Sequence, residues 1–166
     1  MTNETVQVAI IMGSDSDLPI VEASFSILDD FGVKYSKNVM SAHRTPHDVM
    51  ELIKNSEKNG CKVFIAAAGM AAHLAGAVAA HSIKPVIGIP IESGGMGGID
   101  SLLSTAMMPP GVPVATVAVG KSGAKNSAIL AVQILATSNE DLAQKLVLYK
   151  EDMRSEVLEK DKKLNS

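Results

Sequence analysis

Five short stretches of the chain are predicted to be β-strands. Four of them are apolar runs, rich in β-branched residues and bounded by glycine, proline or polar residues, as is typical of parallel strands buried on both faces. The fifth, residues 33–39, directly follows a helix stop signal at Gly32. The predicted strands are residues 6–12, 33–39, 62–68, 85–90 and 112–119.

Helical periodicity separates these strands. Between residues 18 and 31, apolar side chains recur mostly at helical spacing before Gly32 ends the helix. Residues 47–59 carry apolar side chains on one side and charges on the other, and Gly60 follows as a stop. A long and charged stretch from residue 139 to about 162 predicts a last helix beyond the fifth strand.

This alternation predicts an α/β fold, a three-layer α/β/α sandwich with a central parallel sheet of about five strands. Right-handed crossovers between parallel strands place helices on both faces of such a sheet. We expect a single domain over residues 1–166, with its core at about 6–136, because chains of this length seldom divide. The helical extension, about 139–162, could lie on its own domain, but we favour a neighbouring subunit.

Composition narrows the possible partners. The net charge is −3 and no basic block occurs, which disfavours nucleic acid. No apolar run approaches the roughly 20 residues of a membrane span, and the N-terminus lacks a signal-peptide pattern, so we expect a cytoplasmic protein without membrane contact. Trp is absent and Phe and Tyr are few, so further burial through subunit contacts is expected. Cys61 is expected to be a buried, unreactive thiol.

Ligands of open α/β sheets bind beyond the carboxyl ends of the strands, so the loops there are the candidate sites. The first loop reads MGSDSD, and its hydroxyls and backbone N–H groups favour an anion. Its spacing matches neither a dinucleotide-binding GxGxxG nor a Walker loop with its lysine. A helix cap at Ser16 or Asp17 is an alternative that is compatible with ligand binding.

The second loop reads SAHRTP. Arg44 can form a bidentate contact with a phosphate or carboxylate, and Ser41 can add a hydroxyl donor. His43 can give and take a proton near neutral pH, although a surface role for it stays open. A metal shared by His43 and His47 is disfavoured, because Pro46 is expected to start a helix between them and no cysteine or carboxylate completes a ligand set.

The third loop reads AAAGMAAHLAG and runs from a strand end into a helix through residues with almost no side chains. Its exposed backbone amides could hold a small anion or a molecule the size of carbon dioxide, with His73 one turn inside the helix. Close helix packing explains the small residues equally well. A fourth, glycine-rich stretch at residues 88–104 is expected to form a mobile wall over the site.

Seven strings in register resemble the PurE family of purine biosynthesis, and within it class I, the 5-(carboxyamino)imidazole ribonucleotide mutases. They are MGSDSD, SAHRTP, AAHLAG, PVIGIP, GIDSLLS, MPPGVPVATVAVG and GAKNSAILAVQILA. The resemblance implies a flavodoxin-like fold, a homo-octamer with sites at subunit contacts, and no metal or organic cofactor. It also implies a reaction on a small-molecule ribonucleotide, in which a carboxyl group moves from the exocyclic nitrogen to the adjacent ring carbon of an aminoimidazole.

The resemblance further implies a role for each site residue. The residues predicted to bind substrate are Ser14, Ser16, Asp17, Ser41, Arg44, Ala68, Gly69, Ala72, His73 and Leu74. Arg44 and the hydroxyls of Ser16 and Ser41 would bind the ribose phosphate, and Asp17 would accept hydrogen bonds from ribose hydroxyls. The loop at residues 66–72 would hold the migrating carboxyl group.

His43 is implied to be the catalytic residue. It would protonate the exocyclic nitrogen as carbon dioxide leaves, and it would remove the ring proton after the ring carbon captures that carbon dioxide. Capture must be faster than escape of carbon dioxide, so a closed pocket is expected.

Two positions depart from the family pattern, and other functions stay open. Ala75 stands where the family commonly has proline, and Met107 stands where it commonly has glutamine; both are expected near the carboxyl pocket or its cover. The close alternative is class II, which carboxylates aminoimidazole ribonucleotide directly but tends to have SAHKT and to lack an AAHLPG-like string. More distant alternatives are a flavin- or nucleotide-binding module and a purely structural oligomer.

Overall fold

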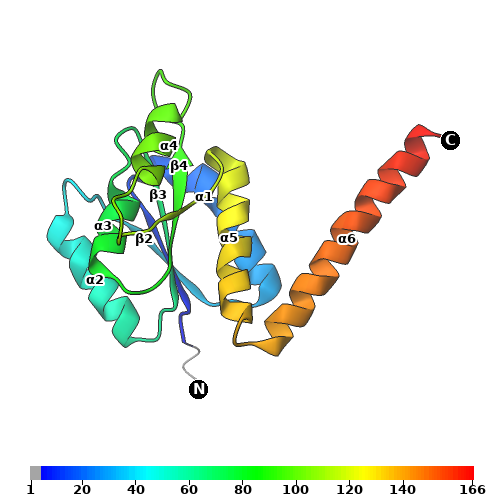
Figure 1. Ribbon diagram of the computed structural model, residues 1–166, viewed down its shortest axis with the longest axis horizontal. Coiled ribbons are helices and arrows are strands. Elements are labelled where there is room, and N and C mark those ends of the chain that lie inside the picture. The colour runs from blue at the N-terminus through cyan, green and yellow to red at the C-terminus, as the bar shows by residue number, and fades with distance from the viewer. Residues whose placement is uncertain (1–4) are drawn as a thin grey trace.

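Five parallel strands form the central sheet of the computed structural model, which describes residues 5–166 (Figure 1). The strands are β1 Val8–Met12, β2 Tyr35–Val39, β3 Val63–Gly69, β4 Val86–Ile91 and β5 Ala115–Thr116. Their order is β2-β1-β3-β4-β5, which is the order of flavodoxin-like sheets. The predicted fold class is therefore confirmed.

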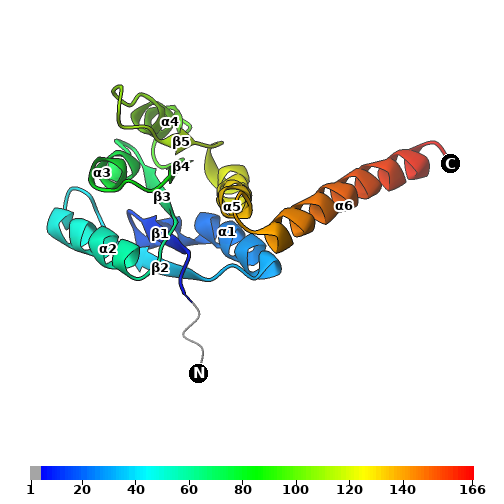
Figure 2. The same ribbon diagram turned by 60° about the horizontal axis from the view of Figure 1, so that its bottom comes forward.

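Helices cover both faces of this sheet. They are α1 Leu18–Phe31, α2 Pro46–Lys58, α3 Leu74–His81, α4 Ile99–Ala106, α5 Gly120–Ala136 and α6 Glu140–Leu164, with a short 3-10 helix at Asp15–Asp17. Figure 2 shows α1 and α5 on one side of the sheet and α2 and α3 on the other. The crossover helices thus give the three layers that the sequence pattern predicts.

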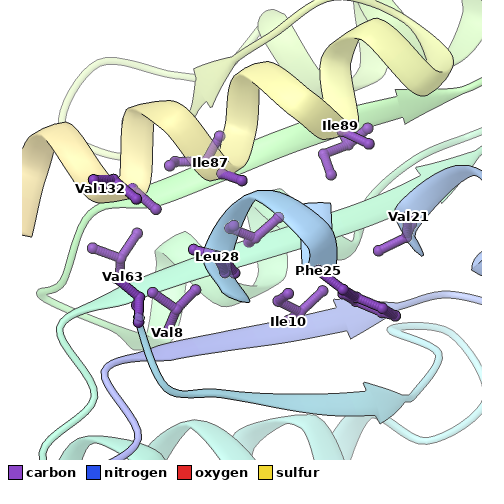
Figure 3. Close-up of a cluster of buried hydrophobic side chains, with 14 of the residues drawn as sticks. Val8, Ile10, Val21, Phe25, Leu28, Val63, Ile87, Ile89 and Val132 are labelled. Atoms are coloured by element: carbon purple, nitrogen blue, oxygen red, sulfur yellow. The ribbon is translucent and has the colours of Figure 1, made fainter. Parts of the chain in front are cut away.

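The side chains of β1 divide the core between the two faces. Val8 and Ile10 pack with α1 and α5, whereas Ala9 and Ile11 pack with α2 and α3. Successive side chains of a strand point to opposite faces, so one apolar strand supplies both layers. Figure 3 shows the first of these clusters, in which Leu28 of α1 lies among the strand side chains.

The fifth strand is shorter than predicted. Only Ala115–Thr116 pair with β4, opposite Ile87 and Gly88, although the apolar pattern extends over residues 112–119. Pro113 has no N–H group to donate to the ladder, and this strand lies at the edge of the sheet. An apolar run at a sheet edge therefore overstates the length of its paired segment.

The last helix, α6, leaves the body of the molecule. Its first turns contact α5, and the rest points away from the sheet (Figure 1). Leu142 is the single buried residue of α6, and every residue from Glu151 onward is exposed. Among residues 5–166, no helix is both long and apolar enough to cross a membrane.

Candidate active site

A pocket of about 470 Å³ opens at the carboxyl edge of the sheet, where the loops after β1, β2, β3 and β4 meet. All the residues predicted for the site line this pocket, except Ala72. The side chain of Ala72 is 2% exposed, so its methyl group is packed inside the protein. Gly13, Ala42, Met70, Ala71 and Ser93 complete the wall.

The loop after β1 is held by a reciprocal cap. The Ser14 hydroxyl accepts a hydrogen bond from the Ser16 backbone N–H at 3.3 Å, and the Asp17 carboxylate accepts one from the Ser14 N–H at 3.1 Å. Ser14 thus caps the short 3-10 helix Asp15–Asp17 with Asp17 as its partner, whereas Asp17 is the N-cap residue of α1 and makes no side-chain cap hydrogen bond to that helix. The Ser16 hydroxyl bonds to Ser14 Oγ at 2.8 Å and stays exposed to the pocket.

Asp17 is buried although it carries a carboxyl group. It is 5% exposed, and burial raises the pKa of this carboxyl above its usual value. The hydrogen bond from the Ser14 N–H acts in the opposite direction, and the charge of Asp15 raises the pKa further. A buried acceptor with free lone pairs at a pocket wall is suited to binding ligand hydroxyl groups.

The turn after β2 presents His43 and Arg44 to the pocket. Thr45 Oγ1 accepts from the Ser41 N–H at 3.0 Å, and Ser41 Oγ accepts from the backbone N–H groups of His43 and Arg44 at 3.3 and 3.2 Å. These bonds fix the turn before Pro46 begins α2, as predicted. The Ser41 hydroxyl still has its own proton to donate to a ligand.

Arg44 reaches across to the first loop. Its Nη2 donates to the Gly13 carbonyl oxygen at 3.3 Å, although the two residues belong to different loops. The guanidinium group therefore lies near the loop that carries Ser14 and Ser16, and this end of the pocket combines a cation with hydroxyl groups. That combination is suited to a phosphate.

His43 meets His73 across the pocket. His43 Nε2 lies 2.8 Å from His73 Nδ1, with the rings edge-on at an angle of 77°. One ring must donate and the other accept, so the two facing nitrogens cannot both carry a proton in this arrangement. The contact joins residues from the loops after β2 and β3.

The position of His73 differs from the prediction. It is the N-cap residue of α3 rather than a residue one turn inside the helix. The loop needs residues 70–73 to turn, since Met70 has a φ of 55° and the His73 N–H donates to the Ala71 carbonyl at 2.8 Å. The helix can begin only after this turn.

The two departures from the family pattern lie away from the pocket wall. Ala75 is 3% exposed and packs in the core between α3 and the sheet, and Met107 is 78% exposed after the end of α4. Neither lines the pocket. Helix α3 turns Ala75 toward Gly88 of β4, so neither residue forms the pocket wall within residues 5–166, and an effect on the cover or on subunit contacts stays a prediction.

Ser93 is not among the predicted site residues, although it belongs to the glycine-rich stretch that is expected to form a wall over the site. It is the second residue after β4 and lines the pocket, whereas the rest of the glycine-rich stretch does not. Its position after a strand on the ligand-binding edge is the signal that could have identified it. Among residues 5–166, no group of three or more His, Cys, Asp or Glu side chains is placed to hold a metal ion.

Comparison with known proteins identifies the family of the chain. A sequence model of the family described as AIR carboxylase matches residues 7–156. The chain belongs to this family. The motif resemblance to the PurE family is therefore confirmed.

Individual members of the AIR carboxylase family match over nearly the full length of the chain. The N5-carboxyaminoimidazole ribonucleotide mutase of Pyrococcus horikoshii is 49% identical over 164 residues, which are 99% of this chain and 92% of that protein. The mutase of Thermotoga maritima is 50% identical over 158 residues, 95% of this chain and 91% of its own. The crystal structure of Treponema denticola PurE has a TM-score of 0.88 at 31% identity, covering 96% of this chain and 99% of that chain.

Proposed function

We propose that this chain is an N5-carboxyaminoimidazole ribonucleotide mutase of purine biosynthesis, an isomerase in which His43 carries the proton. Relatives that are 45–51% identical over most of the chain bear the name of this mutase, which confirms the activity predicted from the motifs. The role of His43 is supported by one observation above all: its ring nitrogen stands in the pocket 2.8 Å from His73, beside the anion-binding end.

The proposed binding mode follows the chemistry of the pocket. The ribose phosphate replaces the Gly13 carbonyl as the partner of Arg44 and takes further hydrogen bonds from Ser16 and Ser41. The buried Asp17 carboxylate accepts hydrogen bonds from the ribose hydroxyls. The aminoimidazole then points toward the loop after β3.

The proposed reaction conserves the proton. The bond between the exocyclic nitrogen and the carboxyl carbon breaks, its electron pair returns to nitrogen, and protonated His43 gives its proton to that nitrogen. The adjacent ring carbon then bonds to the carbon dioxide, and neutral His43 removes the ring proton. The histidine ends as it began, and the main-chain wall after β3 keeps the carbon dioxide near the ring carbon.

The assembly is part of the proposal. We place the chain in a cytoplasmic homo-octamer with sites at subunit contacts, without a nucleic-acid or membrane partner; the number of subunits comes from the family resemblance. Unpartnered apolar surface supports subunit contacts, because Ile99, Leu103 and Met107 follow at intervals of four along α4 and its end and are 57%, 53% and 78% exposed. The projecting α6 offers a second such surface.

The experiment that tests the proposed route follows the carboxyl carbon. The purified chain is given N5-carboxyaminoimidazole ribonucleotide with a ¹³C-labelled carboxyl group in buffer with unlabelled bicarbonate, and the product is examined by mass spectrometry. A mutase retains the label in the carboxylated ring product. Product made mainly from unlabelled bicarbonate would instead identify direct carboxylation, the activity of class II.

A further inference from the structure

The mechanism described above gives no task to Ser93, although this residue lines the pocket. Among residues 5–166, its hydroxyl group has no hydrogen-bond partner. The other pocket serines differ: Ser14, Ser16 and Ser41 all take part in the hydrogen bonds that shape their loops. Ser93 is therefore the one pocket serine whose hydroxyl has no hydrogen bond, as donor or acceptor, within residues 5–166.

Gly69, at the end of β3, makes room for this hydroxyl. A Cβ atom at position 69 would lie 1.8 Å from Ser93 Oγ and 2.9 Å from Ser93 Cβ, which no real side chain tolerates. Gly69 does not have a positive φ angle, so its conformational freedom is not what the fold uses. The absence of a side chain at Gly69 is what lets Ser93 Oγ lie against the backbone of residues 66–72, the loop proposed to hold the carboxyl group.

The sheet order places Ser93 across the pocket from the phosphate end. Arg44 and Ser16 follow β2 and β1, while Gly69 ends β3 and Ser93 follows β4; both of these strands lie on the side of β1 away from β2. His43 extends from the phosphate side toward the β3 side, where it meets His73. A nucleotide anchored at Arg44 thus directs its reacting end toward Ser93.

We infer that Ser93 binds the migrating carboxyl group, its hydroxyl donating a hydrogen bond to a carboxyl oxygen while Gly69 keeps that hydroxyl against the loop. This inference rests on the proposed route of decarboxylation and recapture. A carboxylate can only accept hydrogen bonds, so it matches a free hydroxyl donor. The contact holds one oxygen while the carbon moves from nitrogen to the ring carbon, and it lowers the chance that carbon dioxide escapes.

The first test is Ser93→Ala, measured with the ¹³C-carboxyl substrate. We expect kcat/KM to fall roughly tenfold or more, the effect of losing a hydrogen bond to a charged group. We also expect free aminoimidazole ribonucleotide to accumulate and unlabelled carbon to enter the product. Ser104→Ala, which removes a hydroxyl bonded to the Asp100 carbonyl on α4, is the control and should behave like wild type.

The second test is a double-mutant cycle on stability. Gly69→Ala should lower the midpoint of urea unfolding, and it should lower it less in the Ser93→Ala background, where Oγ is gone. Wild-type kcat/KM without loss of label in a folded Ser93→Ala variant would overturn the inference and leave the mutase route intact. Loss of label in the wild-type enzyme would instead overturn the route itself.

Discussion

Asp17 shows how the site trades stability for binding at the scale of one residue. The carboxyl group is buried at the pocket wall, and that burial raises its pKa. A carboxyl whose pKa is higher in the folded than in the unfolded protein stabilises the fold fully below the unfolded value of 3.8, and this contribution is lost as the pH rises through the folded value. At neutral pH the charged form is therefore held at a cost to the fold.

Asp17→Asn should remove this cost while it weakens substrate binding. The amide oxygen can still accept from the Ser14 N–H, so we expect the fold to persist. The free energy of unfolding should be at least that of wild type at pH 7, and the difference between the two proteins should be smaller at pH 3.5. Nucleotide affinity should fall roughly tenfold. Urea unfolding at the two pH values measures the stability difference, and calorimetric titration measures the nucleotide affinity. A variant that is less stable than wild type at pH 7 but not at pH 3.5 would contradict the expected stabilities.

At the scale of elements, periodicity predicted the buried parts and failed where tertiary geometry decides. The helix at residues 18–31 coincides with α1, and the four apolar runs overlap β1, β3, β4 and β5. The paired length of β5 depends on its edge position and on Pro113, which a hydropathy pattern does not register. The start of α3 depends on the turn at Met70. The space that the Ser93 hydroxyl fills depends on the missing side chain of Gly69, which ends the neighbouring strand.

Ala75 stands where the family commonly has proline, and Ala75→Pro tests whether this residue affects core packing rather than the pocket. Ala75 is the second residue of α3, as Pro19 is the second residue of α1, and an N–H at this position has no partner within the helix. We expect the free energy of unfolding to rise by about 0.4–1 kcal/mol, because proline restricts the conformations of the unfolded chain. Turnover should stay within about twofold of wild type. A large loss of activity in the folded variant would mean that residue 75 shapes the pocket after all.

At the scale of the whole molecule, α6 is the helix that projects from the body of the protein (Figure 1). A helix of 25 residues extends for about 37 Å, and most of it stands clear of the other elements within residues 5–166 (Figure 1). Met153, Val157 and Leu164 lie four and seven residues apart, so they form one apolar side, and they are 43%, 64% and 85% exposed. In the proposed assembly we expect this side to pack on another subunit.

Val157→Glu should therefore reduce the mass of the assembly. A charge on the apolar side opposes contact with another subunit, whereas Ser155→Glu adds the same charge on the opposite side of α6. By light scattering we expect wild type and Ser155→Glu near the mass of eight chains of 17.3 kDa, and Val157→Glu at a smaller mass with unchanged helical content. Equal masses for all three would contradict the role of α6.

At this scale, function depends on four loops that meet at one edge of the sheet, and the central claim is that His43 transfers the proton. His43→Asn keeps a polar side chain in the turn, while His47→Asn changes an exposed histidine that does not line the pocket. The measurement is the interconversion of the two carboxylated ribonucleotides, with nucleotide binding measured in parallel. We predict that His43→Asn binds nucleotide and loses at least about 100-fold in turnover, the usual weight of a general acid or base, while His47→Asn matches wild type. Turnover of folded His43→Asn within tenfold of wild type would contradict the account.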